Sequence, residues 1–354
     1  MLIVYCKGVR EMRKINCLVL AAVGFLITAG SALAQEGVIA DGLHNPRGIV
    51  YDSDGTLFVA EVGLGGDLDV EGNFGPARAG GSSRVSTIAG DGTRSLLIGA
   101  LPSRNEGGEI IGTSRAIPRG DQIWLVFSQG TFVSPFTFAV AALDRATLRI
   151  EHWIDVYSAE AALNPDGGLI DSNPVDIAWD SAGRLYIADA GCNCVWRSDA
   201  SYSGALELFA VWSDNPVPTS VEISPADEIF IGFLTGFPFV EGSARIEQWT
   251  TGGELVTTFT GLTSVVDLLW LDGQIYATEF ARFDMASGWL PNTGRVVRVT
   301  DSGPVAMTEN LNLPYGIAIA PAGNLVAAVN TAYSPDGSGM VISVSPEIAG
   351  MGEG

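Results

Sequence analysis

The chain has 354 residues, of which 40 are acidic and 19 are basic, so its formal net charge is −21. Both lysines and two of the arginines precede residue 35, which leaves the remainder still more acidic. A surface of this sign repels phosphate backbones and anionic bilayers, and it therefore excludes nucleic acid and membrane surfaces as partners.

The first residues have the organisation of a secretory signal peptide. A positive start at Met12-Arg-Lys14 precedes an apolar run over 17–29 and a small-residue stretch that ends at Ala34. We expect Met12 to be the initiator, with cleavage after Ala34 and release of residues 35–354 into the periplasm or the medium. The apolar run is short for a membrane span; a retained anchor is the alternative, and after cleavage we expect no span.

From residue 38 onwards an apolar segment, a turn and a second apolar segment recur six times. The second segments share one form: Leu57–Glu61, Ile123–Phe127, Leu185–Asp189, Ile229–Phe233, Ile275–Glu279 and Leu325–Val329. Several short strands per unit at a spacing of 40 to 50 residues are typical of a β-propeller. The sequence therefore predicts an all-β fold, a six-bladed β-propeller with four-stranded antiparallel blades.

Blade boundaries follow from the turns, where Gly supplies the positive φ that tight hairpins need. We place a single domain over 35–354, with blades at about 38–104, 105–166, 167–214, 215–262, 263–311 and 312–348. The N-terminal strand is expected to complete the last blade, because ring closure removes the open edges of the sheets.

An acidic, glycine-rich insertion over 62–81 interrupts the first blade. Asp67, Asp69 and Glu71 have the spacing of the first ligands of a calcium loop, and Gly72 follows them. Position twelve of such a loop needs a bidentate Glu, and Arg78 stands there. These three acids are candidates for Ca²⁺, with an acidic solvated loop as the alternative.

In a propeller the first strand of each blade lines the central channel. Aligned on the turns, the channel residues are Arg47, Thr113, Val175, Thr219, Val265 or Val266, and Tyr315. A channel Ca²⁺ ion would need carboxylate or amide ligands, and this ring has none. We expect an anion or polar ligand at Arg47, Thr113, Thr219 and Tyr315, or else a dry structural plug.

Few residues outside the channel ring are candidates for catalysis. Glu61, Asp189 and Glu279 end the second strands of three blades, where they either converge as a catalytic or metal-binding set or hold the blade corners through backbone N–H groups. His44 precedes the first channel strand and is a candidate acid or base at the rim. The turn Leu234–Phe239 carries two aromatic residues that predict a rim latch or a contact for an apolar ligand.

Cysteine use also bears on the site. Beyond the leader, Cys192 and Cys194 are the only cysteines. An exported pair can oxidise, but one intervening residue makes a bridge difficult. We expect free or locally paired thiols rather than a metal or redox site; whether the two are bridged is left open.

Several phrases resemble known families. Asn45–Gly48 with Leu57–Glu61 looks like an NHL repeat, and longer phrases resemble the ScyD/ScyE family of exported propeller proteins: Ala161–Gly167, Val217–Ser220, Leu234–Phe239 and Gly242–Arg245. The resemblance covers nearly all of the chain after the leader. It implies an exported propeller, and it implies no reaction and no active-site residues.

Two enzyme families have similar blades. The strand end Ile275–Glu279 resembles those of streptogramin lyases, which use a His and a Glu with magnesium, but no histidine lies in a late repeat here. A gluconolactonase-like enzyme would need metal carboxylates in the channel ring.

We therefore expect an exported, monomeric propeller that binds a small molecule or an extracytoplasmic protein without catalysis. One alternative is a divalent-metal hydrolase or lyase that uses Glu61, Asp189 and Glu279, with or without His44. Another is an extracellular assembly or matrix component. No cofactor is assigned apart from the candidate Ca²⁺.

Overall fold

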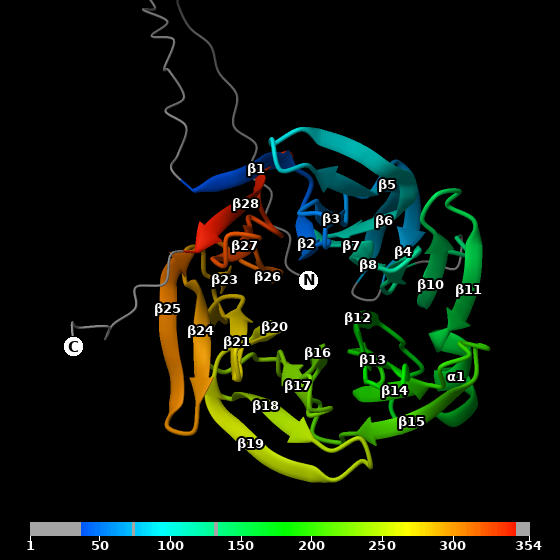
Figure 1. The fold of residues 1–354 in the computed structure, drawn as a ribbon, viewed down its shortest axis with the longest axis vertical. Helices are drawn as coiled ribbons and strands as arrows, with labels where there is room; N and C mark the ends of the chain where they lie inside the picture. Colours follow the sequence, from blue (N-terminus) through cyan, green and yellow to red (C-terminus); the bar gives the residue numbers. More distant parts are fainter. Residues whose placement is uncertain (1–36, 73–74, 131–133, 345–354) are drawn as a thin grey trace, which may run out of the picture. The chain divides into compact units, whose positions relative to one another are not determined.

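The structure of the protein is a computed structural model that describes residues 37–72, 75–130 and 134–344. The expected signal peptide lies outside these residues. The described chain is almost entirely β-structure (Figure 1) and forms six antiparallel sheets of four or more strands.

Two sheets come from the first half of the ring. The first contains β2 (Pro46–Tyr51), β3 (Leu57–Glu61), β5 (Pro76–Ile88), β6 (Arg94–Glu106) and β7 (Glu109–Ile111), with β4 (Leu68–Glu71) beside β5. The second contains β8 (Thr113–Arg119), β9 (Gln122–Phe127), β10 (Ala139–Asp144) and β11 (Ile150–Asp155). Helix α1 (Val156–Leu163) then leads to the third sheet.

The third and fourth sheets follow the simplest order. The third contains β12 (Pro174–Trp179), β13 (Leu185–Asp189), β14 (Cys194–Ser198) and β15 (Leu206–Val211). The fourth contains β16 (Pro218–Ile223), β17 (Ile229–Phe233), β18 (Ala244–Trp249) and β19 (Leu255–Leu262).

The fifth sheet has an added hairpin. It contains β20 (Val265–Leu271), β21 (Gln274–Glu279), β24 (Gly294–Thr300) and β25 (Gly303–Leu311). Between its second and third strands lies the two-stranded ribbon of β22 (Phe283–Asp284) and β23 (Gly288–Trp289).

The last sheet combines both ends of the described chain. Its strands are β26 (Ile317–Ile319), β27 (Leu325–Val329), β28 (Gly339–Val344) and β1 (Val38–Leu43), and β1 pairs antiparallel with β28. The N-terminal strand therefore completes the last blade, as predicted. This pairing ties the two ends of the ring together and covers an outer sheet edge that would otherwise be open.

The innermost strands of neighbouring sheets lie side by side in sequence order, and together they form a closed ring. β2 packs beside β8, and the order continues through β12, β16, β20 and β26 before returning to β2. Apolar side chains fill the space between neighbouring sheets, and the largest fully buried ones are Trp124, Trp196, Tyr186 and Phe233. This arrangement of radial sheets explains why the second strands are apolar on both faces.

The insertion in the first blade does not have the form of the candidate calcium loop. Asp69 and Glu71 lie on β4, which pairs with β5, and Arg78 on β5 forms ion pairs with Asp67 and Asp69. These side chains are exposed and lie along an extended strand, so they do not wrap around a common centre as the ligands of a calcium loop do.

No helix in the described residues is long and apolar enough to span a membrane.

Candidate ligand site in the channel

A cavity opens at the end of the channel where the inner strands begin. We call it the upper cavity; its volume is about 140 Å³. Its lining includes one residue or more from every blade, among them Arg47, Glu109, Ser114, Val175, Thr219, Val266, Phe280, Trp289, Tyr315 and Tyr333. The channel ring expected from the sequence included four of these residues, Arg47, Val175, Thr219 and Tyr315. It also included Val266 as one of two alternatives at its position.

Thr113 is the exception among the expected ring residues. It is fully buried, its amide donates a hydrogen bond to the Ser83 hydroxyl at 3.1 Å, and its neighbour Ser114 lines the cavity instead. The cause is a break in strand register between Thr113 and Arg115. A β-bulge of this kind adds one residue to a strand and re-aims the side chains that follow.

Arg47 supplies the positive charge of the upper cavity. Its guanidinium carbon lies 4.6 Å from the centre of the Tyr315 ring, and Nη2 donates to the carbonyl of Ile110 at 3.2 Å. Among the described residues no carboxylate lies within 4.0 Å of its nitrogens. An arginine held by an aromatic face and one carbonyl keeps donors available for an anionic group.

Aromatic side chains form the wall beside Arg47. Tyr315, Phe280 and Trp289 pack in one cluster with Leu234. Burial, reinforced by Glu109, raises the pKa of Tyr333 to about 12, so its hydroxyl stays protonated and can donate a hydrogen bond at neutral pH. The cavity therefore combines a cation, a phenol and an apolar aromatic surface.

A buried charged triad lies directly below this lining. Arg115, Asp176 and Asp267 each follow a residue of the upper cavity by one position. Arg115 Nε lies 2.8 Å from Asp176 Oδ1, and Arg115 Nη1 lies 3.1 Å from Asp267 Oδ2. We call these three residues the channel triad.

The two aspartates also satisfy the free edges of the inner strands. Asp176 accepts hydrogen bonds from the amides of Ile177 and Val221, and Asp267 accepts from those of Leu268 and Ile317. The innermost strand of each sheet has no further strand to pair with, so its buried N–H groups need such acceptors. The triad therefore acts as a structural plug, a role predicted from the sequence as an alternative for the ring of Arg47, Thr113, Thr219 and Tyr315 and not for these three residues.

Sequence reasoning missed the triad because the expected ring positions stand one or two residues before these side chains in the chain. Register breaks occur at the same point in three further blades, between Pro174 and Asp176, Pro218 and Ser220, and Val265 and Asp267. The channel therefore does contain carboxylates, contrary to the sequence interpretation. The available signal was the acid that stands two residues after the start of the inner strand in two of the repeats, Asp176 after Pro174 and Asp267 after Val265.

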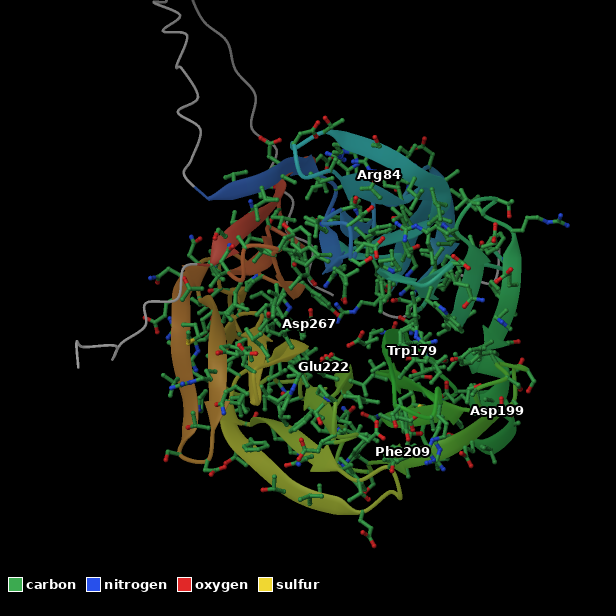
Figure 2. All side chains as sticks on the ribbon, viewed as in Figure 1. Arg84, Trp179, Asp199, Phe209, Glu222 and Asp267 are labelled. Carbon is green, nitrogen blue, oxygen red and sulfur yellow. A yellow bond between two sulfur atoms is a disulfide. The ribbon has the colours of Figure 1, made fainter. Side chains whose placement is uncertain are left out.

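A lower cavity lies on the far side of the triad. Its volume is about 290 Å³, and Tyr51, Glu222 and the triad belong to its lining. Glu222 and Asp267 lie near the axis of the ring, while Asp199 and Phe209 lie near its outer rim (Figure 2). Burial raises the pKa of Glu222 to about 8, aided by the charges of Asp176 and Asp267.

Glu61, Asp189 and Glu279 hold separate blade corners. Glu61 accepts from the His44 amide at 2.7 Å, Asp189 from the Asn173 amide at 2.6 Å, and Glu279 from the Thr263 amide at 3.1 Å. The partners of each come from its own blade or from the segment that leads into it, so the three acids do not form one site. The alternative of a shared catalytic set is therefore not the arrangement found.

His44 serves the same corner as Glu61. Its side chain is half-buried, and burial together with Arg84 lowers its pKa. It does not line the upper cavity. The imidazole is therefore not placed to act on a ligand bound beside Arg47.

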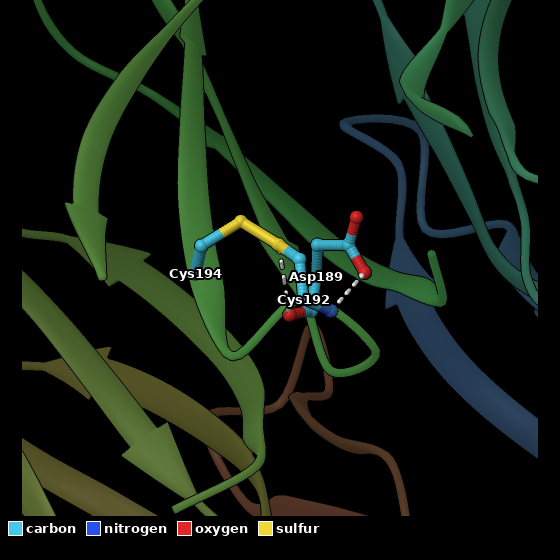
Figure 3. Close-up of side chains that lie close together, drawn as sticks. All are labelled: Asp189, Cys192 and Cys194. Carbon is cyan, nitrogen blue, oxygen red and sulfur yellow. Dashed lines mark hydrogen bonds between the residues drawn. A yellow bond between two sulfur atoms is a disulfide. The ribbon is translucent and has the colours of Figure 1, made fainter. Parts of the chain in front are cut away.

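Cys192 and Cys194 form a disulfide (Figure 3) with Cα atoms 5.2 Å apart, which settles the pairing that the sequence left open. Asp189 lies beside them, and these three are the only group of His, Cys, Asp or Glu ligand atoms within 4.8 Å of one another in the described chain. The Asp189 carboxylate already accepts hydrogen bonds from the Ser172 hydroxyl, the Asn173 backbone amide and the Trp196 indole N–H. The group therefore works as a buried structural corner.

Comparison with known proteins agrees on the fold. No family model matches the chain, and no curated protein matches it. A catalytically inactive virginiamycin B lyase from Staphylococcus aureus with quinupristin superimposes with a TM-score of 0.51 at 14% identity, over 88% of this chain and 98% of that one. These values define the protein as a β-propeller.

Two further solved structures have a similar fold. A gluconolactonase from Xanthomonas campestris has a TM-score of 0.52 at 12% identity, with 86% and 88% of the two chains covered. A putative oxidoreductase (glucose dehydrogenase) from Thermus thermophilus has a TM-score of 0.53 at 12% identity, with 86% and 98% covered. At such identities the similarity concerns the fold alone.

Proposed function

We propose that this protein is an exported, non-catalytic propeller that binds a small molecule bearing an anionic group in the upper cavity. The observation that carries the proposal is Arg47, whose guanidinium lies over Tyr315 in an aromatic-lined cavity without a carboxylate partner in the described chain. A concave, largely apolar site with a few polar groups is the usual form of a small-molecule site.

The chemistry of the lining supports binding over catalysis. A hydrolase or lyase needs an acid, a base, a nucleophile or a metal beside the ligand. The lining contains one carboxylate, Glu109, and neither histidine nor cysteine. The acids of the channel triad are engaged with Arg115 and with backbone amides, which leaves them poorly placed as ligands or bases.

The signal-peptide pattern over residues 12–34 supports export to the periplasm or the medium. The resemblance to the ScyD/ScyE family supports the same compartment. We propose that the protein acts there as a monomer. Light scattering at high protein concentration tests this point, and concentration-dependent association would favour an assembly or matrix component instead.

The binding proposal is tested by calorimetric titration of residues 35–354 with benzoate, phosphate and sulfate. We expect benzoate to bind with one ion per chain and Arg47→Gln to weaken it about tenfold or more, because a charge-assisted hydrogen bond is lost. The matched control is Arg149→Gln, which removes an exposed arginine outside the cavity.

Two outcomes would count against the proposal. Equal binding by wild type and Arg47→Gln would place the anion elsewhere. Turnover of a lactone or of quinupristin that depends on a divalent metal would show an enzyme, the alternative that uses the same fold.

A further inference from the structure

The aromatic wall of the upper cavity continues out onto the rim. Phe280 contacts Trp289 at 5.1 Å between ring centres, and Trp289 contacts both Phe239 at 4.7 Å and Phe283 at 5.1 Å. Phe237 completes the series at 5.9 Å from Phe239 and 6.0 Å from Phe283. We call Phe237, Phe239, Phe283 and Trp289 the aromatic rim.

Exposure is low at the cavity end of this series and high at its outer end. Phe280 is 5% exposed, whereas Phe237 is 64% exposed. Met285, on the turn between β22 and β23, is 69% exposed, and Val240, after Phe239, is 56% exposed. Large apolar side chains that gather at the mouth of a cavity mark a contact surface.

Cavity size limits what the upper cavity can enclose. A dry cavity of about 150 Å³ holds one benzene molecule, and the upper cavity has about 140 Å³. It therefore accommodates one ring with a small substituent. A larger ligand bound at Arg47 must extend out of the cavity, and Trp289 connects the cavity lining to the aromatic rim.

We propose that the ligand is an elongated aromatic anion, with a benzoate-sized end beside Arg47 and a second, uncharged ring on Phe237 and Phe283. This inference rests on the proposed function, since it takes the anionic end to lie in the upper cavity. Flat rings suit a wall whose own rings meet edge to face.

The charged side chains favour one direction for such a ligand. Arg47 lies in the cavity together with one carboxylate, Glu109, whereas the segments that carry the rim bear Asp284 and the ion pair of Arg282 with Glu241 at 4.0 Å. Asp284 is exposed and accepts hydrogen bonds from the amides of Ala286 and Ser287. Arg47 therefore attracts an anionic end inward and Asp284 disfavours one at the rim, while an uncharged ring is accepted there.

Calorimetric titration with paired probes tests the inference. We expect biphenyl-4-carboxylate to bind wild type about tenfold more tightly than benzoate, because its second ring is removed from water on the rim. Phe237→Ala should reduce this ratio to about threefold or less and leave the affinity for benzoate unchanged. Leu255→Ala is the matched control, since Leu255 is 51% exposed on the outer strand β19, and it should change neither affinity.

Each remaining outcome has a distinct meaning. If neither probe binds, the proposed function fails. If benzoate and biphenyl-4-carboxylate bind equally, or Phe237→Ala leaves their ratio intact, the rim is not part of the site and only this inference fails. Octanoate binding as tightly as biphenyl-4-carboxylate would overturn the aromatic class, and equal binding of biphenyl-4-carboxamide would overturn the anionic end.

Discussion

Arg115 extends from the second sheet to the fifth and donates hydrogen bonds through both terminal nitrogens to the carboxylate of Asp267, 152 residues further along the chain. Both side chains are buried. This pair, with Asp176, ties opposite sides of the ring together at the axis, where the inner strands have no further partners. Its consequences for stability can be measured directly.

Replacing Arg115 by Met should destabilise the protein by about 3–5 kcal/mol, because Asp176 and Asp267 would remain as buried, uncompensated charges. Urea unfolding at pH 7 measures this change. The control is Arg78→Met, which removes exposed ion pairs to Asp67 and Asp69 and should cost about 1 kcal/mol or less. Similar losses for the two variants would show that the triad is not a structural plug.

Gly48 provides the space that Arg115 occupies. A Cβ atom at this position would lie 2.6 Å from Arg115 Cδ and 2.7 Å from the Ser114 carbonyl oxygen. We expect Gly48→Ala to cost about 1–3 kcal/mol by overpacking, and less in an Arg115→Ala background, as a double-mutant cycle of unfolding free energies would show. Gly90→Ala is the control, since nothing lies within 4 Å of a Cβ there; an equal loss would contradict the steric account.

Glu61 holds the first blade corner in its charged form. Burial alone would raise its pKa, but Arg84, the His44 amide and the Ser86 hydroxyl lower it overall. A lowered pKa stabilises the fold at pH values above the unfolded value, and this contribution is lost as the pH falls. Glu61→Gln should therefore cost about 2–4 kcal/mol at pH 7 and less near pH 4.

Urea unfolding of this variant at both pH values provides the measurement. Glu71→Gln, which alters an exposed acid on β4, serves as the control. A loss that is the same at pH 4 and pH 7 would contradict a role for the charge of Glu61.

Glu222 should change the free energy of unfolding with pH in the direction opposite to Glu61. Its pKa is raised from 4.5 to about 8, chiefly by burial, so the folded protein holds this proton more tightly than the unfolded chain. The contribution of Glu222 to the free energy of unfolding is therefore present at low pH and is lost as the pH rises from about 4.5 to about 8. Glu222→Gln should then be more stable than wild type by about 1–3 kcal/mol at pH 8, with little difference at pH 4.5.

Thermal and urea unfolding across this pH range provide the measurement. Glu254→Gln, an exposed acid on the turn before β19, corrects for the loss of one negative charge from an acidic protein. A Glu222→Gln variant that is less stable at pH 8 would show that the carboxylate makes favourable interactions in its charged form.

The sequence by itself determined the strands, their order and the closure of the ring. Segments such as Leu185–Asp189 are apolar up to their final acid because they are buried on both faces, and this property is local. It also placed Arg47, Thr219 and Tyr315 in the channel, since each directly follows the Pro at which its repeat enters the channel. The signal peptide, the compartment and the ligand remain predictions from the sequence.

Only the tertiary structure decided which side chains meet at the axis. A one-residue bulge near the start of the inner strands exchanged Thr113 for Ser114 and turned Arg115, Asp176 and Asp267 toward one another. Bulges leave little local signal, because they depend on the partner strand as much as on the residues themselves. The pairing of Arg115 with Asp267 also requires the closed ring, since no local pattern relates residues so far apart in the chain.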